Sequence, residues 1–367
     1  MKYLFPLCLA ALTLVACTKK EAPPAAPAAE PVAKVAEPAA PALPAFSDDM
    51  LKLFGSVPAV IASEKNPVTE EKVALGRTLW FETRMSKNQD LSCNSCHTLA
   101  NYGVDGQPTS TGHKQQKGGR NSPTVYFAAG HLAQFWDGRS PDVEDQAKGP
   151  VLNPVEMAMK DAAAVETVLR SIPEYKVLFE KAFPPAAPGG EVVTFDNAAL
   201  AIAAFERKLV APSRFDKFLA GDKTALTADE QVGLATFVQT GCTGCHSGAY
   251  VGGAQYRKLG EVKPWTRDQD EGRAGVTKNA AEKQLFKVPS LRNIEKTGPY
   301  FHTGGVTKLE EAVKLMAFHQ LGKDVDDATV GRIVTFLKTL TGELPTDFIQ
   351  APTLLPNGPA TPAPDPA

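Results

Sequence analysis

The sequence predicts a mainly α-helical protein made of two related halves with long loops. Apolar residues recur at three- and four-residue steps over residues 198–209 and again over 330–340, which is the period of a helix with one buried side. Strand-like alternation is nearly absent. Residues 76–97 and 233–246 repeat one order of features, an apolar stretch that begins with glycine and then a Cys-x-x-Cys-His motif. This repetition predicts an internal duplication.

The length of the chain predicts more than one domain, because 367 residues fit about two domains of ordinary size. We assign residues 46–210 to an N-terminal domain and residues 211–343 to a C-terminal domain, since Pro212 interrupts the helical pattern between them. Residues 344–367 are a C-terminal tail whose last dozen residues are rich in Pro and Ala. We expect an extended backbone there.

The N-terminus reads as an export signal followed by a tether. The apolar run within residues 1–16 is shorter than the ~20 residues that span a membrane. Leu14-Val15-Ala16-Cys17 resembles a bacterial lipobox, in which the cysteine is acylated; ordinary cleavage after Ala16 is the alternative. Residues 17–45 are rich in Ala and Pro, which predicts a semi-rigid tether. The sequence therefore predicts a lipoprotein anchored to a membrane on the periplasmic side.

The charge of the chain argues against nucleic acid as a partner. Lys and Arg number 39 and Asp and Glu 41, for a formal charge of −2. A chain with balanced charge has no excess of positive charge with which to bind a phosphate backbone.

Two cysteine pairs remain once Cys8 is assigned to the signal and Cys17 to the lipid. They stand in the motifs Cys93-Asn94-Ser95-Cys96-His97 and Cys242-Thr243-Gly244-Cys245-His246. In an exported protein, Cys-x-x-Cys-His is the attachment signature of c-type haem, in which both thiols bond the haem and the histidine binds iron. The sequence therefore predicts two covalently attached haems, with His97 and His246 as proximal iron ligands.

The residues alone leave the iron ligand on the opposite side of each haem open. Met316 is the only methionine after His246, but His319 lies three residues further on, and spacing does not choose between them. For the first haem, His113 lies in a polar, glycine-containing loop over residues 102–122. A ligand on such a loop could be released from iron.

Five further motifs accompany the haem motifs. They are Gly119-Arg120-Asn121-Ser122-Pro123-Thr124, Phe135-Trp136-Asp137-Gly138-Arg139, Asn153-Pro154-Val155-Glu156-Met157, Lys296-Thr297-Gly298-Pro299-Tyr300-Phe301-His302 and Glu311-Ala312-Val313-Lys314-Leu315-Met316. Together they make the chain similar to the bacterial di-haem cytochrome c peroxidase family from about Pro67 to Leu344. The resemblance implies two cytochrome c-like haem domains and an enzyme that reduces hydrogen peroxide to water.

The resemblance also implies roles for single residues. It makes His113 the releasable ligand of the N-terminal, peroxidatic haem and Met316 the axial ligand of the C-terminal, electron-accepting haem. Trp136 matches the tryptophan between the haems. Glu156 and Gln146 match the residues that meet peroxide, where a carboxylate moves a proton between the two oxygens and an amide orients the oxidant.

Further partners follow from the same resemblance. Asn121, Thr297 and Pro299 match a calcium site, and neutral oxygen ligands suit that ion. A small c-type cytochrome or cupredoxin would deliver electrons to the C-terminal haem. Members of the family often form homodimers, so self-association is a further expectation.

Two other functions compete with the peroxidase. A maturation oxidase of the same fold has a tyrosine where Met316 stands, so Met316 argues against it. A non-catalytic di-haem electron carrier has no use for a peroxide pocket, so Glu156 and Gln146 argue against that reading.

Overall fold

The computed structural model describes residues 46–185, 187 and 189–367. Up to residue 206 its helices are α1 (Asp48–Leu51), α2 (Glu70–Trp80), α3 (Cys93–Cys96), α4 (Val143–Gln146), α5 (Gly149–Leu152), α6 (Ala162–Arg170), α7 (Pro173–Ala182) and α8 (Phe195–Glu206). Then follow α9 (Arg214–Leu219), α10 (Ala228–Thr240), β1 (Tyr256–Lys258), α11 (Ala274–Thr277), β2 (Leu285–Lys287), α12 (Leu309–Leu321) and α13 (Asp327–Lys338). The strands pair antiparallel, with Tyr256 opposite Lys287. The mainly helical prediction is confirmed.

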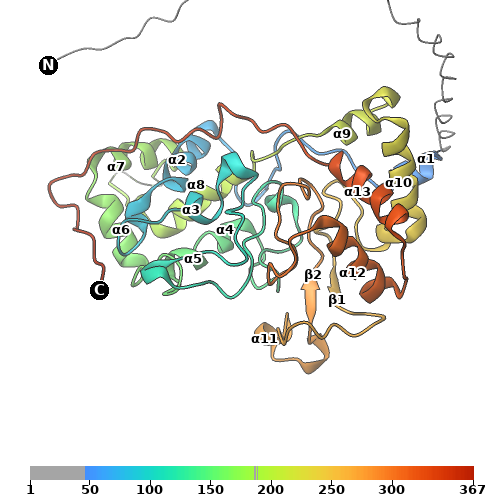
Figure 1. Cartoon of the computed structure of the whole chain (residues 1–367). Helices are drawn as coiled ribbons and strands as arrows, with labels where there is room; N and C mark the ends of the chain where they lie inside the picture. The colour runs from blue at the N-terminus through green and yellow to red at the C-terminus, as the bar shows by residue number, and fades with distance from the viewer. Residues whose placement is uncertain (1–45, 186, 188) are drawn as a thin grey trace, which may run out of the picture. The chain divides into compact units, whose positions relative to one another are not determined.

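The first half is built around the crossing of α2 and α8 (Figure 1). Thr69 and Thr194 are the N-caps of these helices, and each side chain accepts a hydrogen bond from a backbone N–H three residues later. The helices approach so closely that a Cβ on Gly76 would collide with the Ala201 carbonyl. Only glycine fits this crossing, which buries Trp80 beside it.

The second half repeats this arrangement with α10 and α13. Thr227 caps α10, and a Cβ on Gly233 would collide with the carbonyl of Arg332 in α13. Gly241 ends α10 in a left-handed conformation, with φ 102°, and Cys242 follows at once. The glycine that begins each sequence repeat therefore has the same packing role in both halves.

The two halves have separate hydrophobic cores, and the ends of the described chain cross between them. Phe54, near the start, packs with the second core, which α9, α10, α12 and α13 supply. Ile349, near the end, packs with the first core, which α2, α6, α7 and α8 supply. Each half thus receives apolar residues from a distant part of the chain.

The C-terminal segment over residues 344–367 runs along the first half as an extended strap (Figure 1). Ile349 is 6% exposed, and Arg84 donates a hydrogen bond to the Asn357 side chain at 2.7 Å. The backbone N–H of Asp365 donates to the Lys87 carbonyl at 3.0 Å. The extended backbone agrees with the Pro-rich composition, whereas the surface on which it packs could not be predicted.

Among the described residues, no helix is both long enough and apolar enough to cross a membrane. The export signal, the lipidated Cys17 and the tether lie within residues 1–45, outside the described part of the chain.

Candidate functional site

A cavity of about 600 Å³ lies among residues of both halves. Its wall contains nearly all of the predicted site residues: Cys93, Cys96, His97, Cys242, Cys245, His246, Met316, Glu156, Gln146, Trp136, Asn121, Thr297 and Pro299. His113 is the predicted ligand that the wall does not contain within the described chain. Segments that are far apart in sequence therefore meet at one place.

The first attachment motif forms a single helical turn, α3. Ser92 and Ser95 make a capping box at its start, and the N–H of His97 donates to the Cys93 carbonyl at 3.0 Å. Residues three apart on a helix share a face, so both thiols are presented together. In the second motif, the His246 N–H likewise donates to the Cys242 carbonyl, at 2.9 Å.

The attachment residues fit covalent haem. Within the described chain all four thiols are free of disulfide bonds and partly buried. Burial lowers the pKa of His97, and its Nδ1 lies 3.3 Å from the Gly103 carbonyl. Burial also lowers the pKa of His246 to about 4. Both imidazoles are therefore neutral. At His97 the contact of Nδ1 with a carbonyl leaves Nε2 for iron, whereas Nδ1 of His246 has no hydrogen-bond partner among the described residues.

The structure separates Met316 from its rival His319, although both lie on α12. Met316 lines the cavity and packs against a small apolar cluster around Trp265. His319 is buried away from the cavity, with Nδ1 3.0 Å from the Lys263 carbonyl. Of the two candidates, only Met316 faces the space between the attachment motifs.

His113 is not itself on the cavity wall, although its neighbour Gly112 is. It is 6% exposed and begins a 3₁₀ turn, His113–Gln115. Its N–H donates to the Glu156 carbonyl at 2.8 Å. The next two residues are left-handed, with φ 55° at Lys114 and 59° at Gln115, a conformation that costs energy in residues other than glycine.

Glu156 and Gln146 both line the cavity. Burial raises the pKa of Glu156, while nearby Arg139 and a hydrogen bond from Asn153, at 2.8 Å, act in the opposite direction. Glu156 and Arg139 also line a second cavity of about 300 Å³. The carboxylate therefore borders two spaces.

Trp136 is held between the halves by its polar atoms. Its Nε1 donates to the Asn121 carbonyl at 2.9 Å, and its own carbonyl accepts from the Lys287 N–H at 2.9 Å. The ring meets His302 edge to face, with 6.2 Å between centroids. These contacts fix the indole against the second half.

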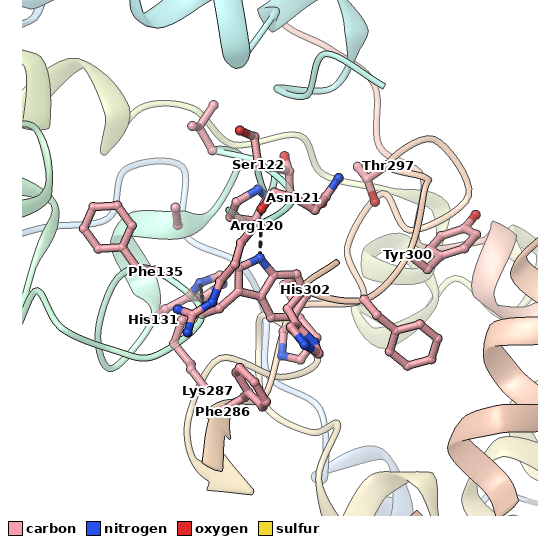
Figure 2. Close-up of a pocket in the computed structure, with 18 of the residues that line it drawn as sticks. Arg120, Asn121, Ser122, His131, Phe135, Phe286, Lys287, Thr297, Tyr300 and His302 are labelled. Carbon is pink, nitrogen blue, oxygen red and sulfur yellow. Dashed lines mark hydrogen bonds between the residues drawn. The ribbon is translucent and has the colours of Figure 1, made fainter. Parts of the chain in front are cut away.

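The three residues matched to a calcium site lie on the same wall, with Asn121 and Thr297 visible in Figure 2. Asn121 is 8% exposed, and its side-chain NH2 group donates to the Gln107 carbonyl at 2.9 Å. This bond does not use the side-chain oxygen of Asn121. The described chain holds no group of three or more His, Cys, Asp or Glu suited to a metal. A cation there would depend on neutral oxygens.

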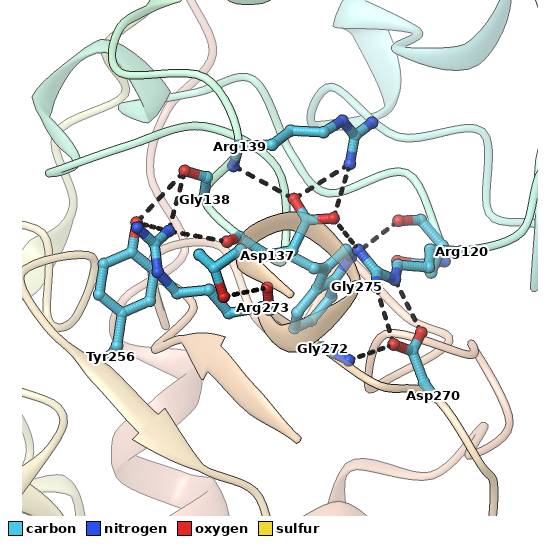
Figure 3. A network of polar contacts seen from close by, with 12 residues as sticks. Arg120, Asp137, Gly138, Arg139, Tyr256, Asp270, Gly272, Arg273 and Gly275 are labelled. Atoms are coloured by element: carbon cyan, nitrogen blue, oxygen red, sulfur yellow. Dashed lines mark hydrogen bonds and ion pairs between the residues drawn. The ribbon is translucent and has the colours of Figure 1, made fainter. Parts of the chain in front are cut away.

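A polar network beside Trp136 links the two halves (Figure 3). Arg120 pairs with Asp137 at 2.5 Å and with Asp270, from the second half, at 2.7 Å. Arg273 donates to the carbonyls of Asp137 and Gly138, each at 3.2 Å. The second-half members were missed, because their sequence carries no motif.

Three titratable residues of the wall were also missed: Glu206, His131 and Lys287. Burial raises the pKa of Glu206 to about 8, and its Oε2 has no hydrogen-bond partner among the described residues. A carboxylate at the C-terminal end of an apolar helix interacts unfavourably with the helix dipole. This position is the signal in the sequence that could have identified Glu206. His131 and Lys287 carry no such signal.

Comparison with known proteins shows the family of the chain. The family described as di-haem cytochrome c peroxidase matches residues 70–224. The cytochrome c551 peroxidase of Nitrosomonas europaea is 46% identical, over 86% of this chain and 94% of that protein. The cytochrome c551 peroxidase of Pseudomonas aeruginosa is 44% identical, over 87% of this chain and 92% of that protein.

A solved structure agrees as well. The crystal structure of a MauG-like protein associated with microbial copper homeostasis has a TM-score of 0.69 at 28% identity and covers 84% of this chain and 97% of its own. Fold and paired attachment motifs thus define a di-haem c-type protein. The chain belongs to the di-haem cytochrome c peroxidase family, which confirms the resemblance seen in its motifs.

Proposed function

We propose that this chain reduces hydrogen peroxide to water, with electrons from a small c-type cytochrome or cupredoxin. The observation that carries the proposal is the shared cavity, whose wall unites both haem attachment motifs with Glu156 and Gln146. The names of the relatives, cytochrome c551 peroxidases, support it.

Two haems would be held by the attachment cysteines. His97 would bind the first iron, and His246 with Met316 the second. A thioether ligand raises the reduction potential of a haem, which suits the second site to accepting electrons. When bound, the haems supply the redox chemistry. Electrons would enter at the C-terminal site and pass to the N-terminal site, and Trp136 would lie between the two sites.

Glu156 is the proton-moving residue in this proposal. As a carboxylate it would accept the proton of one peroxide oxygen and give it to the other oxygen, which leaves as water when the O–O bond breaks. The oxygen that remains would take up two electrons, supplied through the haems from two donor molecules, and two protons from solvent, and so become the second water. Burial raises the pKa of Glu156, and nearby Arg139 acts in the opposite direction. Gln146 orients the peroxide through its amide.

His113 is the releasable ligand of the first haem in this proposal. Its neighbour Gly112 lines the cavity, and its N–H bonds the carbonyl of Glu156, another wall residue, so the loop that carries His113 borders the cavity. Ligation would then require this loop to move toward the cavity. The oxidised protein is expected to be six-coordinate at the first haem and nearly inactive until half-reduced.

The remaining assignments belong to the same proposal. Asn121, Thr297 and Pro299 bind one calcium ion and couple the halves. Residues 46–210 and 211–343 are the two haem domains, and self-association gives a homodimer. Acylated Cys17 and the tether place the enzyme at a membrane on the periplasmic side.

Steady-state turnover tests the proposal against its rivals. The full-length holoprotein is mixed with reduced small cytochrome c and hydrogen peroxide, and both are followed. A peroxidase oxidises two donor molecules per peroxide. An electron carrier accepts electrons without consuming peroxide, and that result would contradict the proposal. A maturation oxidase would consume peroxide only when a protein substrate is present.

A further inference from the structure

Lys287 is a buried cation without a carboxylate partner. It ends β2, is 8% exposed and lines the central cavity (Figure 2). Its Nζ lies 3.5 Å from Nδ1 of His131, and burial alone accounts for a pKa lowered to about 8. The cavity arginines differ, because Arg120 and Arg139 both pair with Asp137. Among the described residues, no acid balances Lys287.

His131 adds a second unmatched donor at the same place. When Nδ1 accepts from the Lys287 ammonium, the ring proton lies on Nε2. That Nε2 is shielded from solvent and has no partner among the described residues. The ring is fixed by Tyr250, edge to face, and a Cβ on Gly253 would strike it. A rigid pair of buried donors requires an anionic acceptor, since burial of unpaired donors is unfavourable.

The surroundings indicate which anion this is. Lys287 also bonds the Trp136 carbonyl through its own N–H. Pro289, two residues later, has a carbonyl close enough to His246 to affect the pKa of its ring. The donor pair therefore lies beside the second attachment motif and the tryptophan between the sites. Each haem of the proposed function brings two carboxylates into this cavity.

We infer that Lys287 and His131 together bind a haem carboxylate, and that they position the haem edge beside Trp136 and tune its reduction potential. The inference rests on the two haems of the proposed function, but not on peroxide turnover. A cation held at a haem carboxylate cancels negative charge near the iron and so favours the ferrous state. Lys287 and His131 are positioning residues and need not contact peroxide.

The test is a spectroelectrochemical titration of the holoprotein at fixed pH and salt. Lys287→Met removes the charge at nearly equal length, Lys287→Arg keeps it, and Lys258→Met removes an exposed charge from the neighbouring strand. We expect Lys287→Met to weaken reduction of one haem about tenfold, ~59 mV for a one-electron couple. Lys287→Arg should restore most of this shift, and Lys258→Met should leave both potentials unchanged.

The titration decides whether Lys287 binds a haem carboxylate, and which haem carries it. The haem whose potential shifts is the one whose carboxylate is bound, so the titration distinguishes the carboxylates of the two haems. Unchanged potentials of both haems in Lys287→Met would overturn the inference, whether or not the protein consumes peroxide. A shift in a protein without turnover would instead contradict only the proposed function.

A measurement on the unmutated protein covers the case in which variants fail to mature. Haem carboxylates are labelled with ¹³C, and redox-induced infrared difference spectra are recorded. We expect one labelled carboxylate to show the bands of an ionised, strongly hydrogen-bonded group. Labelled carboxylates that all respond as freely hydrated ions would overturn the inference.

Discussion

Titratable residues of the cavity wall differ from those at the protein surface because burial shifts their pKa values. Glu156 and Glu206 are both carboxyl groups whose pKa burial raises, yet Glu156 has Arg139 and Asn153 as partners. Glu206 has a buried oxygen without a partner in the described chain. The first is therefore suited to exchanging a proton, and the second to staying protonated.

Replacing Glu156 by Gln should lower peroxide turnover by about 10²–10⁴-fold, the usual contribution of a general base. In the parent enzyme, turnover should fall as the pH is lowered through the raised pKa of Glu156, because only the carboxylate accepts a proton. Glu174→Gln on exposed α7 is the matched control and should keep full activity. Equal turnover in Glu156→Gln and Glu174→Gln would remove Glu156 from the mechanism.

Glu206 should make the folded protein less stable as the pH rises. Its pKa is about 8 when folded and near 4.5 when unfolded, so the folded state binds more protons between these values. The stabilisation is complete below the lower value and is lost as the pH rises through about 8. Urea unfolding of Glu206→Gln should show a flatter pH profile than the parent. An unchanged profile would show that Glu206 titrates normally.

At the scale of elements, one helix crossing defines each half. Gly76 and Gly233 allow α2 to contact α8 and α10 to contact α13. The same helices, α2 and α8 in the first half and α10 and α13 in the second, also contribute apolar residues to the cavity wall. The position of the attachment motifs therefore depends on how closely these helices approach.

Gly76→Ala should destabilise the protein by about 1–3 kcal/mol, because the added methyl overpacks the crossing against the Ala201 carbonyl. Gly331→Ala in α13 is the control, since a Cβ there meets no atom within 4 Å. That change should stabilise the helix by roughly 0.5–1 kcal/mol. Thermal unfolding compares the two, and the prediction fails if both variants shift in the same direction.

At the scale of the whole molecule, the C-terminal strap connects the end of the second half to the first core. Deleting residues 345–367 removes Ile349 and should cost about 1.5–3 kcal/mol for that side chain alone. Deleting only residues 363–367, which are exposed, should change little. Circular dichroism melting of the holoproteins measures both, and equal melting temperatures would show that the strap does not stabilise the fold.

Much of this architecture could be predicted because its signals are local. Helical period, the repeated glycine and the two Cys-x-x-Cys-His motifs are all written in short stretches of sequence. Met316 and His319 could not be separated, since both lie on α12 and only packing turns one toward the cavity. The contact between Lys287 and His131 could not be predicted from the sequence, because the two residues are 156 positions apart and meet only in the folded chain.

The most direct test of the account is an anaerobic titration of the half-reduced holoprotein with hydrogen peroxide, following the visible spectrum of each haem. The account predicts that one equivalent of peroxide oxidises the reduced, methionine-bound haem, which supplies one of the two electrons that peroxide takes, and that the second electron comes from the first haem site. A reduced haem that persists in excess peroxide would contradict it.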